Sequence, residues 1–338
     1  MPCYHPLKGW PIGQTAKGKT KYKITPYAVN HVERTTSGSY ESVDVDFLTS
    51  RGVAAIRDYV EIPCGQCIGC RLDRSRAWAD RCLLEASQYP HNCFLTLTYD
   101  DVHLPTREYV DPNTGELCTS FPLCKRDLQL FFKRLRKKYG SGIRFFACGE
   151  YGDQTFRPHY HAIVFNHDFE DKKLFKVSDL GHLYYNSDSL DALWPFGYAI
   201  TASVSWETCA YVARYVAKKL TGPLAQFYAD HGLEPEFANM SRRPGISRAW
   251  YDEHQDILSD IHIATPDGGK KIRPPKFWRR IHESIDADLV AAESQRLKDR
   301  AIAQRRLILD QTSKDFQNYC ETLEANKKAA VLALKRGF

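Results

Sequence analysis

Hydrophobic and polar positions in the middle of the chain follow two different periods. In the segment CFLTLTY at 93–99, every second position belongs to one apolar set, which predicts a β-strand. In CKRDLQLFFKRLRKKYG at 124–140, apolar residues recur every three or four positions. This spacing predicts an amphipathic helix that ends at Gly140.

The same two patterns continue on both sides of this pair. They predict helices over 72–87, 188–197 and 207–220, and strands over 143–152, 157–165 and 198–206. From residue 93 onwards the order is strand, helix, strand, strand, helix, strand, helix. Strands joined by short hairpins, with helices between them, are typical of an antiparallel α+β fold and not of a doubly wound parallel sheet.

The flanking regions are less regular. Residues 1–62 are rich in Gly, Thr, Ser and Lys, and we expect them to be irregular. Residues 100–123 indicate a long connection with turn signals, whereas 284–338 lack proline and predict long helices. We expect four parts. They are an N-terminal segment with cysteines and a helix at 1–90, a core at 91–222, a basic and aromatic extension at 223–282, and a helical region at 283–338.

The overall composition is that of a globular protein. The 338 residues are 43% apolar and 26% charged, with a mean hydropathy of −0.47 and a net charge of +6. These values exclude a collagen and a wholly disordered chain. We find neither an apolar membrane span nor a secretory signal, so we expect no membrane partner. In a cytoplasmic protein, the 11 cysteines are better interpreted as thiols or metal ligands than as disulfides.

Two histidines, His159 and His161, are one residue apart in a predicted strand, so both imidazoles point to one face. An H-x-H pattern by itself is more often a pair of half-buried histidines than a metal site. Glu150 ends the preceding strand, and a hairpin brings its carboxylate beside them. Two imidazoles and a carboxylate suit a divalent ion that must also hold a phosphate oxygen.

Tyr211 and Tyr215 lie four residues apart in YVARYVAKK, so a helix places both phenols on one face. Tyrosines at this spacing usually belong to a core. Here Arg214, Lys218 and Lys219 interleave cations with them. A nearby cation or metal favours the phenolate form that nucleophilic attack requires.

Three cysteines, Cys64, Cys67 and Cys70, are spaced so that their thiolates could converge on one soft ion. The simpler interpretation is buried free cysteines. An iron–sulfur cluster is a further alternative, but we prefer structural zinc because nothing else in the chain points to redox chemistry. The candidates for a fourth ligand are Cys3 first, then Cys82 and His91.

Positive charge is concentrated in two runs. Residues 121–144 hold eight basic residues and one acidic residue, and KKIRPPKFWRR at 270–280 holds six basic residues. A charged run is usually a solvated face, but cations interleaved with aromatic rings suit single-stranded nucleic acid, through phosphate pairing and base stacking. The candidates for DNA contact are Arg134, Lys137, Lys138, Arg214, Lys219, Lys271, Arg273 and Trp278.

Together these motifs resemble the rolling-circle replication initiators of the HUH endonuclease superfamily. More closely, they resemble the replication-associated proteins of the microviruses, particularly the gokushovirus branch. FLTLTY at 94–99, RPHYHAIVF at 157–165 and YVARYVAKK at 211–219 are similar to the superfamily's core-strand, metal-binding and tyrosine motifs, in the same order. CGQCIGCR, GEYG and MSRRPGI are similar to segments of the phage proteins. The resemblance covers most of residues 64–250.

This resemblance implies a ferredoxin/RRM-like HUH endonuclease core with a central antiparallel sheet, beside the N-terminal Cys-rich segment and the C-terminal helices. It implies that His159, His161 and Glu150 bind a divalent metal, Mg²⁺ or Mn²⁺, and that the two tyrosines are the nucleophiles. Some relatives have lysine where this chain has Arg214. Because arginine does not release its proton, Lys218 is the better candidate for an acid or base.

The expected function is initiation of rolling-circle DNA replication in the host cell cytoplasm. A tyrosine would nick single-stranded origin DNA, remain bound through a 5′-phosphotyrosine, leave a 3′-OH primer for a host DNA polymerase and later rejoin the strand. The chain has no G-x-x-x-x-G-K-[ST] motif, so unwinding would fall to a host helicase.

Two alternatives belong to other classes. A non-catalytic zinc-dependent DNA-binding protein leaves the tyrosine pair unexplained. A metal-dependent nuclease that uses water needs more carboxylates near the histidines than Glu150.

Overall fold

The structure is a computed structural model. It describes residues 3–16, 18–45, 47–49, 51–152, 155–179, 181–215, 219–220, 222–254, 261–265, 268–272 and 274–333, with the backbone alone at 215 and from 261 to 271. The chain divides into two compact units. We call Met1–Asp73 with Lys298–Leu334 the terminal unit, and Arg74–Leu297 the sheet unit.

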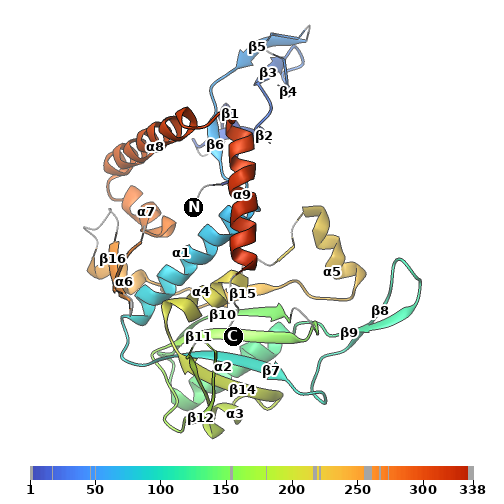
Figure 1. The fold of residues 1–338 in the computed structure, drawn as a ribbon, viewed down its shortest axis with the longest axis vertical. Helices are drawn as coiled ribbons and strands as arrows, with labels where there is room; N and C mark the ends of the chain where they lie inside the picture. Colours follow the sequence, from blue (N-terminus) through green and yellow to red (C-terminus); the bar gives the residue numbers. More distant parts are fainter. Residues whose placement is uncertain are drawn as a thin grey trace. The chain divides into compact units, whose positions relative to one another are not determined.

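The sheet unit is built on seven strands that pair antiparallel in the order β12-β13-β14-β7-β11-β10-β15 (Figure 1). Their bounds are β7 Asn92–Tyr99, β10 Arg144–Tyr151, β11 Pro158–Phe165, β12 Lys173–Val177, β13 Leu183–Asn186, β14 Gly197–Ser203 and β15 Phe237–Met240. The predicted antiparallel α+β class and its four predicted strands are therefore confirmed. Strand β12 escaped prediction because all of its residues are exposed, which leaves no two-residue period.

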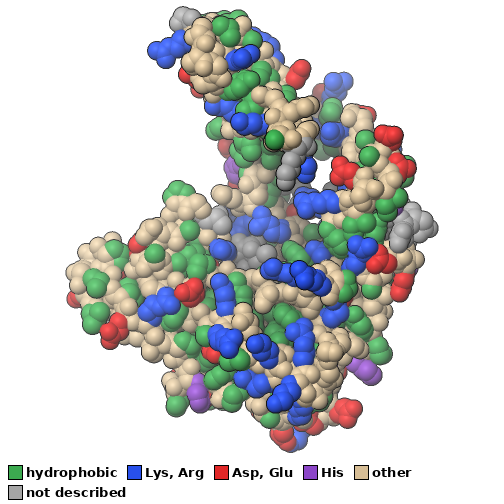
Figure 2. All heavy atoms as spheres, turned by 180° about the vertical axis from the view of Figure 1, so that it is seen from behind, with side chains coloured by type: hydrophobic (Ala, Val, Ile, Leu, Met, Phe, Trp, Pro, Cys, Tyr) green, Lys and Arg blue, Asp and Glu red, His purple; other side chains and the backbone are tan. Residues whose placement is uncertain are grey.

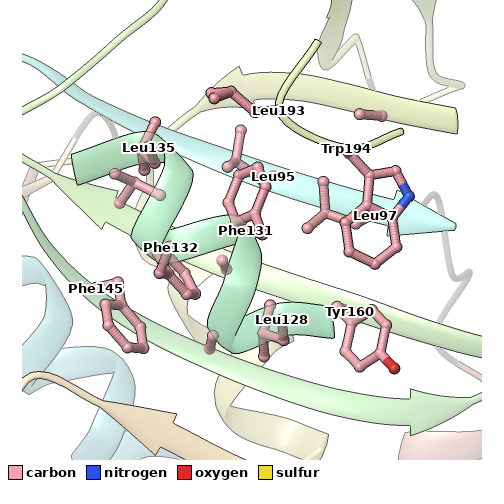
Figure 3. Packing of buried hydrophobic residues seen from close by; sticks show 14 of the residues in the cluster. Leu95, Leu97, Leu128, Phe131, Phe132, Leu135, Phe145, Tyr160, Leu193 and Trp194 are labelled. Carbon is pink, nitrogen blue, oxygen red and sulfur yellow. The ribbon is translucent and has the colours of Figure 1, made fainter. Parts of the chain in front are cut away.

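Helix α2, Lys125–Tyr139, covers one face of this sheet, which we call the α2 face. The helix ends as predicted, at Gly140, whose φ of 106° favours glycine. Its apolar stripe, Leu128, Phe131, Phe132 and Leu135, packs in one core with residues of the strands and of the segment before β14. Figure 3 shows the stripe together with Leu95, Leu97, Phe145, Tyr160, Leu193 and Trp194. Among the described residues this is the largest core.

The opposite face of the sheet, which we call the site face, is covered by α4 and the second half of α1. Helix α1 spans Ile68–Ala86, and α4 spans Trp206–Tyr215. Successive residues of β11 alternate between the faces: Tyr160 and Ala162 join the core under α2, and Ile163 joins the core under α4. This alternation places both histidines of the H-x-H motif on the site face.

The expectation of an irregular segment at 1–62 is wrong. This part of the terminal unit forms two three-stranded sheets, in the orders β2-β1-β6 and β4-β3-β5. The strands are β1 Leu7–Gln14, β2 Thr20–Pro26, β3 His31–Thr35, β4 Tyr40–Val43, β5 Gly52–Ile56 and β6 Val60–Ile62. They were missed because few apolar residues mark their core, of which the fully buried Trp10 is one.

The connection at 100–123 contains a two-stranded hairpin, β8 Arg107–Val110 and β9 Leu117–Ser120. Its turn lies within this predicted connection, and there the Gly115 N–H donates to the Asp111 carbonyl over 2.8 Å. Helix α3 ends earlier than predicted, and the remaining elements were not predicted. Their bounds are α3 Asp188–Asp191, η1 Gly222–Ala225, α5 Gln226–Asp230, α6 Arg248–Glu253, β16 Ile261–Thr265, β17 Gly268–Ile272 and α7 Lys276–Glu283.

The long helices predicted near the C-terminus are confirmed as α8, Ala287–Asp310, and α9, Phe316–Leu332. Asp315 caps α9, because its carboxylate accepts a hydrogen bond from the Asn318 N–H. Among the described helices, none combines the length and the apolar composition that a bilayer span requires.

Candidate active site and metal centres

The pairing of β10 with β11 brings Glu150 beside the histidines. Glu150 lies directly opposite His159 in the register, and its Oε1 is 2.9 Å from His161 Nε2. Both members of this closer pair are only 4% exposed. The other imidazole nitrogen of His161, Nδ1, is 3.0 Å from the Thr96 hydroxyl, so two neighbouring strands fix the orientation of this ring.

His159 is held differently from its neighbour. Its Nδ1 donates to the Arg157 carbonyl over 2.7 Å, which leaves the lone pair of the ring on Nε2. Burial lowers the pKa of His159, and the neutral imidazole is the form that ligates metals. Gly152 lies against this ring, because a Cβ on Gly152 would be 3.2 Å from His159 Cε1.

The donor set of Glu150, His159 and His161 has the chemistry of a divalent-metal site. Metal-ligating histidines typically donate their second ring N–H to a carbonyl or other acceptor, as His159 does. The ligand atoms of these three side chains are not all close to one another. Among the described residues, one group of three or more His, Cys, Asp or Glu side chains has all its ligand atoms within 4.8 Å of one another, and that group lies elsewhere in the protein. Glu150 and His161 form a preformed pair, and His159 stands beside it.

Tyr211 is brought to this pair by α4. Its ring lies edge-on to the His161 ring, with centroids 5.0 Å apart and an angle of 84° between the planes. Phe94 contacts both rings, stacked on His161 and edge-on to Tyr211. The first tyrosine of the pair is therefore a neighbour of the candidate metal ligands, although it lies 50 residues further along the chain than His161.

The other residues of the tyrosine motif are only partly described. The backbone of Tyr215 ends α4, and its side chain lies outside the described residues, as does Lys218 altogether. Arg214 and Lys219 are both exposed. These two cations are thus accessible to a phosphate.

A second candidate metal centre lies in the terminal unit. The four sulfur atoms of Cys3, Cys64, Cys67 and Cys70 all lie within 4.8 Å of one another. Four thiolates are the ligand set of a structural zinc site, and this group could hold such a metal. Cys3 is thus the fourth member of the group. The alternative Cys82 is buried in the core beneath α4.

Backbone N–H groups surround the sulfur atoms of this cluster. The N–H groups of Tyr4 and Cys70 point at Cys67 Sγ, over 3.4 and 3.5 Å, and that of Cys64 points at Cys3 Sγ over 3.2 Å. Burial opposes ionisation of Cys67, but these donors and the neighbouring thiols outweigh it and lower its pKa to about 7. Thiolates stabilised in this way are suited to metal binding.

The cysteine cluster is also a packing site for the C-terminal helix α9. Cys320 and Leu323 of α9 belong to the same small core as Tyr4 and Cys67. Glu324 accepts hydrogen bonds from the backbone N–H of Ile68 and from His5. The first described residues of the chain and helix α9 therefore meet at the four thiols.

The basic run on α2 lies on the other side of the sheet from the histidines. Lys125, Arg126, Lys133, Lys137 and Lys138 are exposed, and Figure 2 shows a dense group of Lys and Arg side chains on the face seen from behind. Because α2 packs on the face opposite α4, these cations do not surround the candidate active site. Arg134, another predicted contact, is engaged within the protein, where its Nε donates to the Leu193 carbonyl.

The expectation that Trp278 stacks on DNA bases is not supported. Trp278 is 1% exposed, and it stacks on Trp250 with ring centroids 5.2 Å apart. It forms a small core with Leu84, Tyr251 and Ile272. The other two candidates of this run, the Lys271 side chain and Arg273, lie outside the described residues.

Sequence reasoning missed Thr96 and Gly152, which position the two histidines. Thr96 stands on the polar side of the alternating segment CFLTLTY, and a polar residue there is a weak signal for a contact across the sheet. Gly152 ends the GEYG segment, but only the fold shows that it lies against an imidazole ring.

Comparison with known proteins agrees with the resemblance of the motifs. The family model "Replication-associated protein ORF2/G2P" matches residues 92–220, which include both histidines and both tyrosines. No solved structure matches the chain.

Three relatives are replication-associated proteins of phages. The chain is 32% identical to replication-associated protein VP4 of Bdellovibrio phage phiMH2K, over 76% of this chain and 79% of the relative. It is 30% identical to replication-associated protein ORF2 of Spiroplasma virus 4, over 75% and 79%. It is 34% identical to replication-associated protein ORF4 of Chlamydia phage 1, over 47% of this chain and 38% of the relative.

Proposed function

Because the chain belongs to the family of the replication-associated proteins of microviruses, we propose that it initiates rolling-circle replication by nicking one strand of origin DNA. The observation that carries this proposal is the contact between Tyr211 and His161, which is itself paired with Glu150. A phenol beside a candidate metal site is the arrangement that covalent cleavage of a phosphodiester requires.

In the proposed reaction, the phenolate oxygen of Tyr211 attacks the phosphorus atom of one phosphodiester in single-stranded DNA. A tyrosine–phosphate bond forms, and the bond between phosphorus and the 3′ oxygen breaks. The phenol loses its proton, and the leaving 3′ oxygen takes one up. The products are a 5′-phosphotyrosine and a free 3′-OH, and the reverse reaction rejoins the strand without ATP. Tyr215 is the proposed second nucleophile.

His159, His161 and Glu150 would hold a divalent ion, Mg²⁺ or Mn²⁺, which when bound polarises a phosphate oxygen. The buried pair of Glu150 and His161 orients this part of the site, and Thr96 fixes the tilt of the His161 ring. We assign phosphate contacts to the exposed Arg214 and Lys219, and a role as acid or base to Lys218.

The strand order supports the finer proposal of a ferredoxin/RRM-like HUH core. Four strands lie side by side in the order β14-β7-β11-β10, which are the fourth, first, third and second of the four along the chain, and α2 connects β7 to β10. This is the order of a split β-α-β unit with an antiparallel sheet. In this proposal the core occupies 91–222, and the remaining three predicted parts, 1–90, 223–282 and 283–338, are appended to it.

DNA, structural zinc and host proteins complete the proposal. The exposed lysines of α2 would bind a stretch of DNA separate from the scissile phosphate, because they lie on the opposite face of the sheet. The four cysteines would hold zinc. A host helicase and a host polymerase would supply unwinding and synthesis in the host cytoplasm, since the sequence carries no P-loop motif.

The decisive experiment is to incubate the protein with end-labelled single-stranded DNA of the phage origin and Mn²⁺, then look for an adduct that survives SDS. We expect an adduct at the 5′ end of the fragment downstream of the cut, which peptide mapping assigns to Tyr211 or Tyr215. Cleavage without an adduct would indicate a nuclease that uses water. Binding without cleavage would favour the non-catalytic zinc protein, to which the cysteine cluster gives some support.

A further inference from the structure

One row of side chains crosses four neighbouring strands on the site face. Glu150 of β10 pairs with His159 of β11, His159 pairs with Thr98 of β7, and Thr98 pairs with Tyr198 of β14. Directly paired residues of antiparallel strands point to the same side of a sheet. Tyr198 is therefore on the face of the candidate metal ligands, about 10 Å from His159 at two strand spacings.

This end of the site face is open at Tyr198. The next residue along β14, Ala199, points the other way into the core under α2. Helix α4 packs over β10 and β11, and the core beneath it contains the row of Ala202 and Phe94, four residues nearer the far end of these strands. Tyr198 is 71% exposed, which is unusual for a tyrosine within a central strand.

From this row we propose that Tyr198 is a stacking platform for a base of the single strand that enters the active site. It is a positioning residue, since it lies beside the candidate ligands and does not contact the reacting atoms. The proposal takes its ligand, single-stranded DNA, from the proposed function. It does not depend on whether the strand is then cut.

The chemistry of the neighbouring surface fits this ligand. An aromatic ring on an open sheet face can stack on any base, because every base has a π-face. Lys176 of β12 is an exposed cation on the same face, but its pairing with Tyr184 places it in the row of Ala202, four residues along β14 from Tyr198. A strand that leaves His159 across the sheet thus meets an exposed aromatic ring in the same row.

The test measures binding without cleavage. The full chain is titrated into a fluorescein-labelled oligothymidylate in the absence of divalent metal, and affinity is read from anisotropy. Tyr198→Leu should weaken binding about five-fold or more, while Tyr198→Phe, which keeps the ring, should bind within two-fold of the original chain. Tyr22→Leu, a matched change at an exposed tyrosine of the terminal unit, should have no effect.

A second readout locates the contact. The same oligonucleotide with 5-iodouracil in place of thymine is irradiated with the original chain, and cross-linked peptides are mapped by mass spectrometry. We expect a cross-link at Tyr198 and none at Tyr22. The proposal falls if Tyr198→Leu binds as tightly as the original chain, if the cross-links avoid Tyr198, or if oligothymidylate is not bound.

These outcomes separate the two proposals. Tyr198-dependent binding without any covalent adduct on origin DNA would reject the nicking function and keep the platform. If an adduct forms and Tyr198→Leu binds DNA with unchanged affinity, the nicking function is kept and the platform is rejected.

Discussion

Tyr211 meets the ring of His161 edge-on at 5.0 Å between centroids, and His161 in turn lies 2.9 Å from the carboxylate of Glu150. This chain of contacts joins a helix to two strands of the sheet. It places the phenol of Tyr211 where it could attack a phosphate that is also held by a metal bound to the histidines.

The two tyrosines should alternate as nucleophiles, since rolling-circle synthesis must cut once to begin and once to finish. After the first cut, one phenol carries the 5′ end, and a second, one helical turn away, is needed for the next. Tyr211→Phe and Tyr215→Phe should each form an adduct but release no unit-length circles, and the double variant should form no adduct. Complete circles from either single variant, measured on an origin plasmid, would reject alternation.

His161→Ala should abolish nicking while most DNA binding remains, because phosphate contacts are spread over other residues. Thr96→Val keeps the shape of the side chain but removes the hydroxyl that holds His161. It should lower the nicking rate about 10- to 100-fold, as is typical for partners of metal ligands, and excess Mn²⁺ should restore part of it. Thr96→Ser is the matched control and should stay near the original rate. Full activity of His161→Ala in the presence of a chelator would contradict the metal site.

The four-cysteine cluster should bind one zinc ion per chain, which elemental analysis can measure. Cys67→Ser should lose this zinc, and the terminal unit should unfold at lower temperature. At free zinc a thousand times the Kd, binding stabilises the folded form by about 4 kcal/mol. Cys118→Ser, at a half-buried cysteine of β9 in the sheet unit, should change neither quantity. Purified protein without zinc or iron would reject the centre.

The exposed cations of α2 should supply non-specific affinity without taking part in cleavage. Changing Arg126, Lys133 and Lys137 together to glutamine should flatten the dependence of log K on log salt, by about 0.7 for each phosphate that the protein no longer neutralises. At saturating DNA the nicking rate should be unchanged, because these residues lie on the face away from Tyr211. A changed rate at saturation, or an unchanged slope, would show that this surface has another role.

The ion pair between Glu61 and Arg305 should make the stability of the terminal unit depend on pH. Arg305 donates from both terminal nitrogens to Glu61, at 2.5 and 2.6 Å, and this lowers the pKa of the carboxyl group. Because the folded-state pKa is depressed, the stabilisation is present above the unfolded pKa and is lost as pH falls through the folded one. Denaturant titrations at neutral and acidic pH should show this loss in the original chain and a smaller loss in Arg305→Gln. An equal loss in both would reject the contribution.

Much of the sheet unit could be predicted from the sequence. The apolar stripe of α2, the alternation in β7 and the H-x-H pattern of β11 each lie within one segment, so their periods fix which side chains share a face. The spacing of Cys64, Cys67 and Cys70 likewise predicts a cluster from local geometry.

A period shows that one face of an element is buried, but not which element covers it. Only the fold decided that the cations of α2 lie away from the histidines and that Trp278 is covered by Trp250. Cys3 joins a cluster 61 residues further along the chain, and Tyr198 reaches the row of His159 through β7. Such contacts depend on packing between distant segments, and the order of residues within one segment carries no record of that packing.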